Sequence, residues 1–218
     1  MSAPTDDRQT AYLQYSRGTV VDRFGVWLSA RQVRRFVPSF AGKRVGDFGC
    51  GYQASFARGL LGEAASVVLV DVALAEDLKA EALKADARAA DARVRAIEGR
   101  LPDALAALPA ASLDVVLLVS VLEHVTEPQR LLAETARLLA PGGVALVNVP
   151  SWRGKRYLEL ATFRLHLGAA SEIDDHKMYY DVRDLWPMLV AAGFRPSRIR
   201  CFPHKFGLNT FAVCQAAP

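Results

Sequence analysis

The chain has few of the features that would set it apart from ordinary globular proteins. Three cysteines among 218 residues are an odd number without paired spacing, so we expect reduced thiols and no disulfide framework. No apolar run approaches the roughly 20 residues of a membrane-spanning helix, and the first ten residues lack the apolar segment of a signal peptide. We therefore expect a cytoplasmic protein without a transmembrane segment.

The chain also lacks a large excess of charge of one sign. The net charge of +4, from 27 basic and 23 acidic residues, is compatible with an anionic small molecule but is far from the signature of a nucleic-acid-binding protein. No aromatic residues interleave the basic ones, and no repeat or low-complexity tract occurs. We expect no nucleic-acid partner, and a monomer or a homodimer.

The most informative feature that is present is a glycine-rich turn. A short apolar strand ends at Asp47, Gly49 and Gly51 follow, and a helix is expected from about Gln53. Glycines at a helix start let a ligand lie against bare N–H groups, where the helix dipole attracts a carboxylate or phosphate. The turn predicts a nucleotide-type cofactor, and two cofactor classes use such a turn.

The rest of the chain alternates between strands and helices. Strands are expected at 44–47, 66–71, 94–97, 114–120 and 144–149, with helices at 53–61, 75–92 and 126–140 between them and a final strand pair at 198–202 and 209–214. The continuous apolar run 114–120 is typical of a strand buried on both faces. This alternation predicts an α/β fold with a parallel sheet and a ligand at the carboxyl ends of its strands.

Two parts of the chain fall outside that alternation. Apolar residues at helical spacing before Pro38 predict that residues 1–39 form an N-terminal helical lid segment. Residues 40–218 are predicted to form a single domain with a helical insertion at about 151–181. We expect the lid and the insertion to cover the bound substrate.

Four stretches together resemble the class I S-adenosylmethionine-dependent methyltransferases. They are Val45–Gly51, Val68–Asp71, Leu113–Val125 and Leu138–Gly143, in this order and spacing. The resemblance implies a Rossmann-like, doubly wound, seven-stranded sheet, mostly parallel with an antiparallel C-terminal strand and helices on both faces. It also implies methyl transfer from S-adenosyl-L-methionine, with S-adenosyl-L-homocysteine as product.

The resemblance assigns cofactor roles to eight positions. Asp47 would lie near the ammonium group, and Asp71 would accept hydrogen bonds from both ribose hydroxyls. The full predicted set is Asp47, Gly49, Gly51, Asp71, Gly99, Leu101, Ser120 and Val121. Two positions depart from the family pattern, because Tyr52-Gln53 stand where a third glycine is common and Arg100 stands where an acid is usual.

Two alternatives remain open. The run from Gly49 to Ala54 also fits the dinucleotide fingerprint of NAD(P)-dependent oxidoreductases. Asp47 favours the methyltransferase, because a negative charge suits an ammonium group and opposes a pyrophosphate. The second alternative is a non-catalytic module on the methyltransferase scaffold.

The sequence says less about the residues that would bind the methyl acceptor. Segment 172–180 contains carboxylates, His176 and two tyrosines. It can supply a general base, form a metal site or be a plain polar loop. We predict His176 as the general base and no metal site, because adjacent loop residues rarely converge on one ion. His124 can act as a base or bond locally. A small-molecule or glycan-linked acceptor, which can be anionic, is predicted to contact Tyr15, Arg153, Asp175 and Tyr179.

Overall fold

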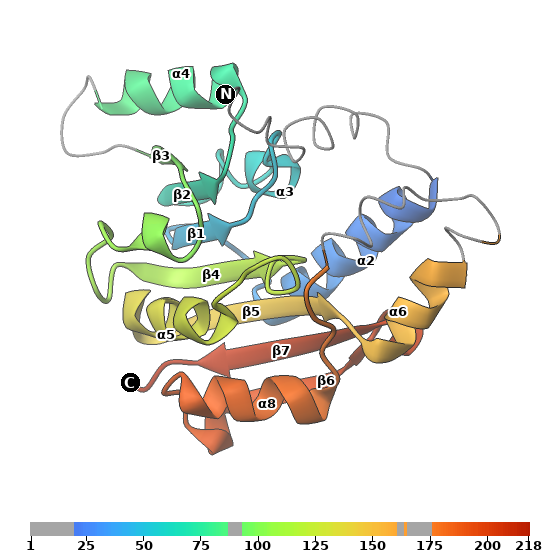
Figure 1. Cartoon of the computed structure of the whole chain (residues 1–218). Helices are drawn as coiled ribbons and strands as arrows, with labels where there is room; N and C mark the ends of the chain where they lie inside the picture. The colour runs from blue at the N-terminus through green and yellow to red at the C-terminus, as the bar shows by residue number, and fades with distance from the viewer. Residues whose placement is uncertain (1–19, 87–92, 161–163, 165–175) are drawn as a thin grey trace, which may run out of the picture.

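A seven-stranded sheet forms the centre of the molecule (Figure 1). The computed structural model describes residues 20–86, 93–160, 164 and 176–218. The strands are β1 (Arg44–Phe48), β2 (Ser66–Asp71), β3 (Val94–Glu98), β4 (Leu113–Val119), β5 (Leu139–Pro150), β6 (Ile199–His204) and β7 (Asn209–Gln215). Their spatial order is β3-β2-β1-β4-β5-β7-β6.

The strand directions confirm the predicted topology. Strands β1 to β5 pair in parallel, and β7 lies antiparallel between β5 and β6. Along β4, Val116, Leu117 and Leu118 are each fully buried, because helices cover both faces of a parallel sheet. The carboxyl ends of β1 to β5 therefore meet at one edge.

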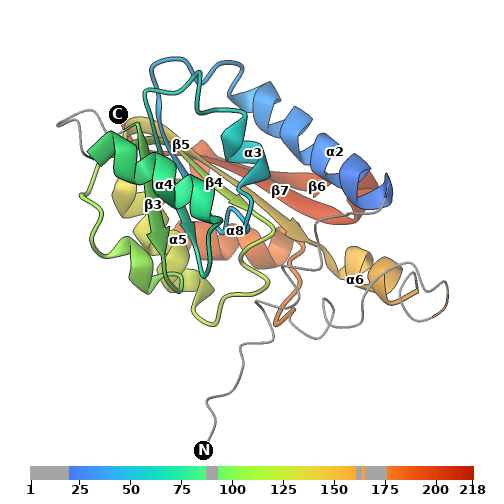
Figure 2. The same cartoon turned by 90° about the horizontal axis from the view of Figure 1, so that it is seen from above.

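Helices cover the sheet on both faces (Figure 2). One face carries α2 (Val20–Phe36), α3 (Ser55–Arg58) and α4 (Glu76–Asp86), which pack in one apolar cluster with β1 and β2. The other carries α5 (Pro128–Leu138) and α8 (Val182–Ala191), whose buried leucines belong to a second cluster. Short 3-10 turns complete the fold at Asp103–Leu105, Pro196–Arg198 and Lys205–Gly207.

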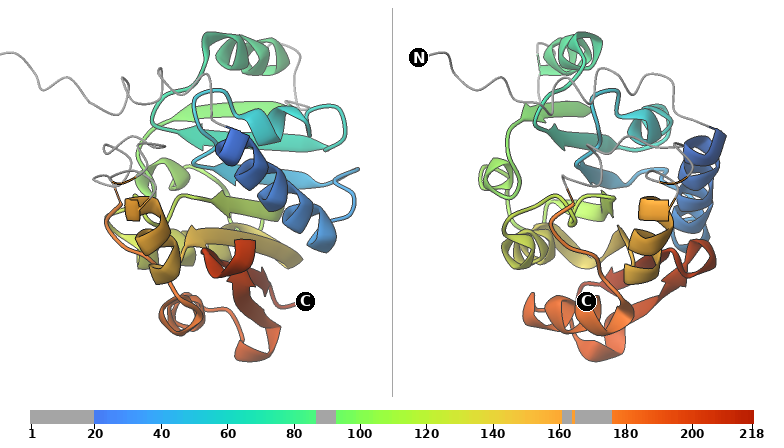
Figure 3. Two further views of the ribbon diagram at one scale, coloured as in Figure 1. Left: turned by 90° about the vertical axis from the view of Figure 1, so that its right-hand side faces the viewer. Right: turned by 45° about the vertical axis from the view of Figure 1, so that its right-hand side comes forward.

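The insertion begins with α6 (Trp152–Glu159), which lies at the carboxyl edge of the sheet (Figure 3). Ser151 caps it by accepting a hydrogen bond from the Gly154 amide at 3.0 Å. A Cβ at Gly154 would stand 2.1 Å from the Leu208 carbonyl oxygen, so only glycine lets α6 pack this closely on the turn before β7. Most of the remaining insertion, 161–163 and 165–175, lies outside the described residues.

The predicted lid is described only from residue 20. Val33 of α2 and Val37, which follows the last residue of the helix, are buried, whereas Phe24 and Trp27 of α2 are about half exposed. The lid role, the domain division and the oligomeric state stay predictions. None of the helices in the described ranges combines the length and apolar character needed to cross a bilayer.

Three element boundaries differ from the sequence prediction. Helix α3 covers only Ser55–Arg58 of the expected 53–61. Helix α5 covers Pro128–Leu138 of the expected 126–140, and no side chain caps its start. Strand β5 begins at Leu139 rather than Val144, because Leu139 already pairs with Leu113 of β4. In each case tertiary pairing or packing decided where a locally ambiguous segment ends.

Candidate active site

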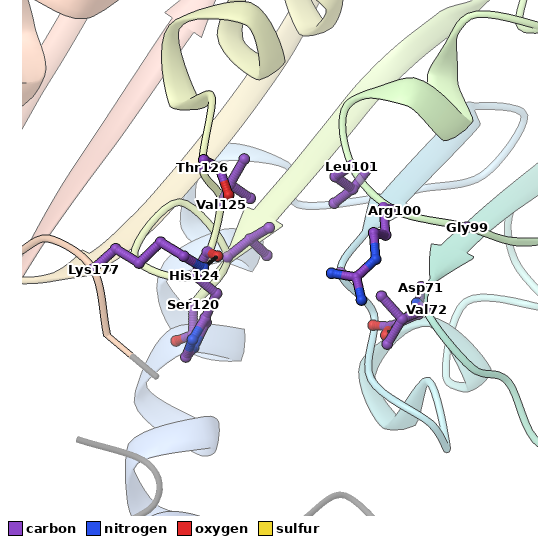
Figure 4. A pocket seen from close by; sticks show the side chains of 12 residues that line it. Asp71, Val72, Gly99, Arg100, Leu101, Ser120, His124, Val125, Thr126 and Lys177 are labelled. Atoms are coloured by element: carbon purple, nitrogen blue, oxygen red, sulfur yellow. Dashed lines mark hydrogen bonds between the residues drawn. The ribbon is translucent and has the colours of Figure 1, made fainter. Parts of the chain in front are cut away.

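A pocket opens at the carboxyl edge of the sheet, where the ends of four strands meet (Figure 4). Figure 4 shows Asp71, Val72 and Arg100 on one side, with Ser120 and His124 on the other. Six of the eight predicted cofactor residues line the pocket: Gly49, Asp71, Gly99, Leu101, Ser120 and Val121. The remaining lining residues are Val72, Arg100, His124, Val125, Thr126 and Lys177.

The glycine turn is tied to the end of β2 by Asp71. One carboxylate oxygen of Asp71 accepts from the Gly51 amide at 2.7 Å, and the other accepts from the Val72 amide at 2.7 Å. Each carboxylate oxygen has a second lone pair, so Asp71 can still receive hydroxyl donors from the pocket. The side chain thus shapes the turn and presents an acceptor to the pocket.

Val121, on the opposite wall of the pocket, leaves no room for a side chain at Gly49. The φ of Gly49 is 72°, and a Cβ there would lie 2.5 Å from Cγ2 of Val121, which follows β4. Ser120 also has a left-handed φ of 58°, and its amide donates to the Asn148 carbonyl at 2.8 Å. Non-glycine residues in this region carry strain that surrounding contacts must hold, and such strain concentrates at functional sites.

Asp47 lies behind the turn and does not line the pocket. It is 5% exposed, and burial, helped by the charge of Asp71, raises its pKa to about 7. A buried carboxylate is costly without a cation, so this position favours a positively charged group of a ligand. Burial also raises the pKa of the neighbouring Cys50 thiol, which makes that cysteine a packing residue rather than a reactive one.

Comparison with known proteins identifies the family. A sequence model described as "Methyltransferase domain" matches residues 22–198. The chain belongs to this methyltransferase family. Its methyl donor is S-adenosylmethionine, which confirms the predicted cofactor, and the match does not favour the oxidoreductase alternative.

Individual relatives agree with the family match. A ubiquinone biosynthesis O-methyltransferase from Psychrobacter arcticus is 35% identical over 138 residues, which cover 61% of this chain and 50% of that protein. The match therefore spans about half of the curated relative. Among solved structures, a SAM-dependent methyltransferase from Thermotoga maritima has a TM-score of 0.62 at 18% identity, with 94% of both chains covered. One from Archaeoglobus fulgidus has a TM-score of 0.60 at 17% identity, covering 86% of this chain and 93% of that one. These structures support the fold.

The residues of the methyltransferase fit the cofactor. Asp47 offers a buried negative charge for the ammonium group, and Gly49 leaves open backbone where Val121 approaches. Asp71 presents its carboxylate to the pocket for the ribose hydroxyls. The individual roles of all eight residues, Gly51 and Leu101 included, remain predictions.

The methyltransferase also gathers a polar cluster around His124, which lines the pocket. A carboxylate oxygen of Glu123 and one ring nitrogen each of His124 and His176 lie within 4.8 Å of one another. The amide of Lys177 donates to the Glu123 carbonyl at 2.7 Å, and Lys177 Nζ donates to the His124 carbonyl. These bonds hold the segment that carries His176 against the turn after β4.

Two of the predicted acceptor residues are among those described. Tyr179 is 4% exposed, and its hydroxyl lies 3.0 Å from Nδ1 of His176, so it holds the predicted base in place. Arg153 is exposed on α6 and does not line the pocket; its guanidinium lies near Gly207. Tyr15 and Asp175 lie outside the described residues.

The sequence prediction did not place Glu123 in the site, left the role of His124 open between a base and a local hydrogen bond, and did not include Lys177. The signal that could have revealed the first two is their position directly after the most apolar strand, where parallel sheets place ligands. Lys177 had no such signal, because only the tertiary fold brings its segment to the pocket.

Proposed function

We propose that the protein transfers the methyl group of S-adenosylmethionine to a hydroxyl oxygen of a small-molecule acceptor. The observation that carries the proposal is the place of His124, which lines the cofactor pocket and lies 4.8 Å, between ring centroids, from His176. The name of the O-methyltransferase relatives supports oxygen as the acceptor atom and a small molecule as the substrate class.

The chemistry needs alignment more than activation. When bound, S-adenosylmethionine supplies a methyl carbon to which the acceptor oxygen bonds while the carbon–sulfur electron pair passes to sulfur, leaving S-adenosylhomocysteine. Ser120 and Val121 would align the two reacting atoms and exclude water. A hydroxyl must also lose its proton, and this requirement gives the two imidazoles a role that an already neutral amine nucleophile would not need.

We propose that His176 assists the loss of that proton. Tyr179 orients its ring through the 3.0 Å contact with Nδ1. Helices α2 and α6 flank the same edge of the sheet (Figure 3), which supports their proposed place around the acceptor. A glycan-linked or anionic acceptor and the contributions of Tyr15, Arg153 and Asp175 are further proposals without a contact in the described residues.

The test is methyl transfer from labelled S-adenosylmethionine to a dihydroxybenzoate and to the aminobenzoate of matched size. We expect S-adenosylhomocysteine and an O-methyl product in equal amounts with the first compound only. His176→Ala should lower kcat by about a hundredfold or more, the usual contribution of assisted proton transfer. Its affinity for S-adenosylhomocysteine should stay within about twofold of the parent protein, because His176 is not among the residues that line the cofactor pocket.

Two results would overturn the proposal. Methylation of the amine alone would move the acceptor atom from oxygen to nitrogen. Tight binding of S-adenosylhomocysteine without turnover on any acceptor of a broad hydroxyl panel would favour the non-catalytic module. His204→Ala serves as the matched histidine control, since His204 does not line the pocket, and it should keep its turnover.

A further inference from the structure

The carboxylate of Glu123 is one of the few buried polar groups of the described chain that lack a hydrogen-bond partner, and it lies next to His124 of the pocket. Glu123 is 1% exposed, and its Oε2 atom is buried with no hydrogen-bond partner among the described residues. A buried, unsatisfied carboxyl oxygen costs free energy that folding must offset. Native proteins keep few such groups, and one beside a pocket indicates a ligand.

Neighbouring cations do not account for this carboxylate. The charge of Lys205 acts on Glu123, but among the described residues no ion pair joins the two within 4.0 Å. A buried carboxylate that no described side chain neutralises favours a cation as its partner.

The side chains around Glu123 are those that bind metals. Its carboxylate and the ring nitrogens of His124 and His176 approach one another within 4.8 Å. Two atoms bound at about 2.1 Å to one ion lie about 3 to 4 Å apart, so a contraction of about 1 to 2 Å completes the set. Side-chain rotation covers that range.

The Tyr179 hydroxyl orients the His176 ring as in histidines that bind metals. Nδ1 of His176 lies 3.0 Å from this hydroxyl. In the tautomer that donates from Nδ1, the other ring nitrogen keeps its lone pair. Histidines that bind metals almost always use their second nitrogen for such a bond, which fixes the ring and its tautomer.

We propose that Glu123, His124 and His176 bind one divalent first-row transition ion, and that this ion holds the acceptor hydroxyl next to the cofactor pocket. Two imidazoles and one carboxylate suit ions such as Zn²⁺, and three protein ligands leave coordination positions open for substrate. The second half of the proposal rests on the proposed function. In it His176 assists the loss of the hydroxyl proton as a ligand of the cation rather than by accepting the proton itself.

The first experiment measures binding of the metal alone. The full chain, stripped with a chelator, is titrated with Zn²⁺ by calorimetry, and Co²⁺ is added in parallel to record its visible absorption. We expect one site per chain. Glu123→Gln and His176→Gln should each weaken Zn²⁺ binding by at least about tenfold, since loss of even a supporting residue costs this much.

Matched controls separate the cluster from its surroundings. Glu127→Gln removes an exposed carboxylate four residues away, and His204→Gln removes a histidine outside the cluster. Both should bind Zn²⁺ as the parent does. Binding of S-adenosylhomocysteine verifies that each variant is folded, and if Glu123→Gln fails this check, the partly exposed His176→Gln carries the test.

The outcomes distinguish the two proposals. Absence of a one-to-one Zn²⁺ site, or equal affinity in the cluster variants and the controls, overturns the metal site whatever the methylation assay shows. A metal site that is confirmed in a protein methylating only amines overturns the proposed function and the acceptor role of the ion. Methylation of hydroxyls that is lost on chelation and restored by Zn²⁺ supports both.

Discussion

Asp47 shows how one residue can couple ligand binding to pH. It faces Asp71 from a buried position, and burial raises its pKa to about 7. Because this value lies above the unfolded value of 3.8, its contribution to stability is present below about pH 4 and lost as the pH rises through 7. Ionisation therefore costs the ligand-free protein stability, and in the predicted role of Asp47 the ammonium group of the cofactor would offset that cost.

The resulting prediction concerns affinity for S-adenosylhomocysteine between pH 6 and pH 8. A carboxyl with a pKa of about 7 is about one-tenth ionised at the lower pH and about nine-tenths at the higher. Calorimetry should show affinity rising by about tenfold. Asp47→Asn should bind more weakly at pH 8 and lack this rise, and the same pH slope in the variant would assign the effect to another group.

At the scale of elements, hydrogen bonds between helix starts hold the segment that carries His176. The Asp184 carboxylate accepts from the Asp181 amide at 2.9 Å, where α8 begins, and from the indole N–H of Trp152 in α6 at 3.2 Å. The Tyr180 amide donates to the Pro150 carbonyl at 2.9 Å. Residues 176–181 are thereby fixed across the carboxyl edge of the sheet.

Asp184→Ala should destabilise the fold and loosen this edge. Loss of a helix-start acceptor costs about 1 kcal/mol, and the indole bond is lost with it. Urea unfolding measures the change. Asp103→Ala, which removes only an exposed ion pair with Arg130, is the control and should cost less, because surface pairs contribute little. An equal loss in both variants would contradict the proposed link.

At the scale of the whole molecule, the pocket depends on the complete sheet. Its lining follows the ends of β1, β2, β3 and β4, and the cores on both faces hold these strands in register. A ligand in this pocket therefore binds the folded chain and not the unfolded one. Ligand binding and global stability are linked for this reason.

S-adenosylhomocysteine should raise the Tm accordingly. At a concentration of 100 times its Kd it stabilises the folded state by about 2.7 kcal/mol, which corresponds to roughly 5 to 10 °C for a chain of this size. NADH at the same concentration should leave the Tm unchanged. Asp71→Ala should lose the shift, because Asp71 joins the glycine turn to β2; a shift with NADH alone would revive the oxidoreductase alternative.

The sequence by itself determined the architecture and the cofactor end of the site. Apolar runs such as Asp114–Ser120 are typical of buried strands, and their alternation with helices allows few topologies. Gly49 follows β1 and Asp71 ends β2, so a parallel sheet brings both to one edge. These features are local in the chain, and local patterns are what a sequence displays.

Only the tertiary structure decided the acceptor end. Glu123 and His176 are 53 positions apart, and no periodicity relates them; the bond from the Lys177 amide to the Glu123 carbonyl brings them together. The sequence prediction of no metal site considered only neighbours within one loop, and it stays a prediction. Contacts between distant segments depend on how elements pack, which is why the cofactor could be predicted and the polar cluster could not.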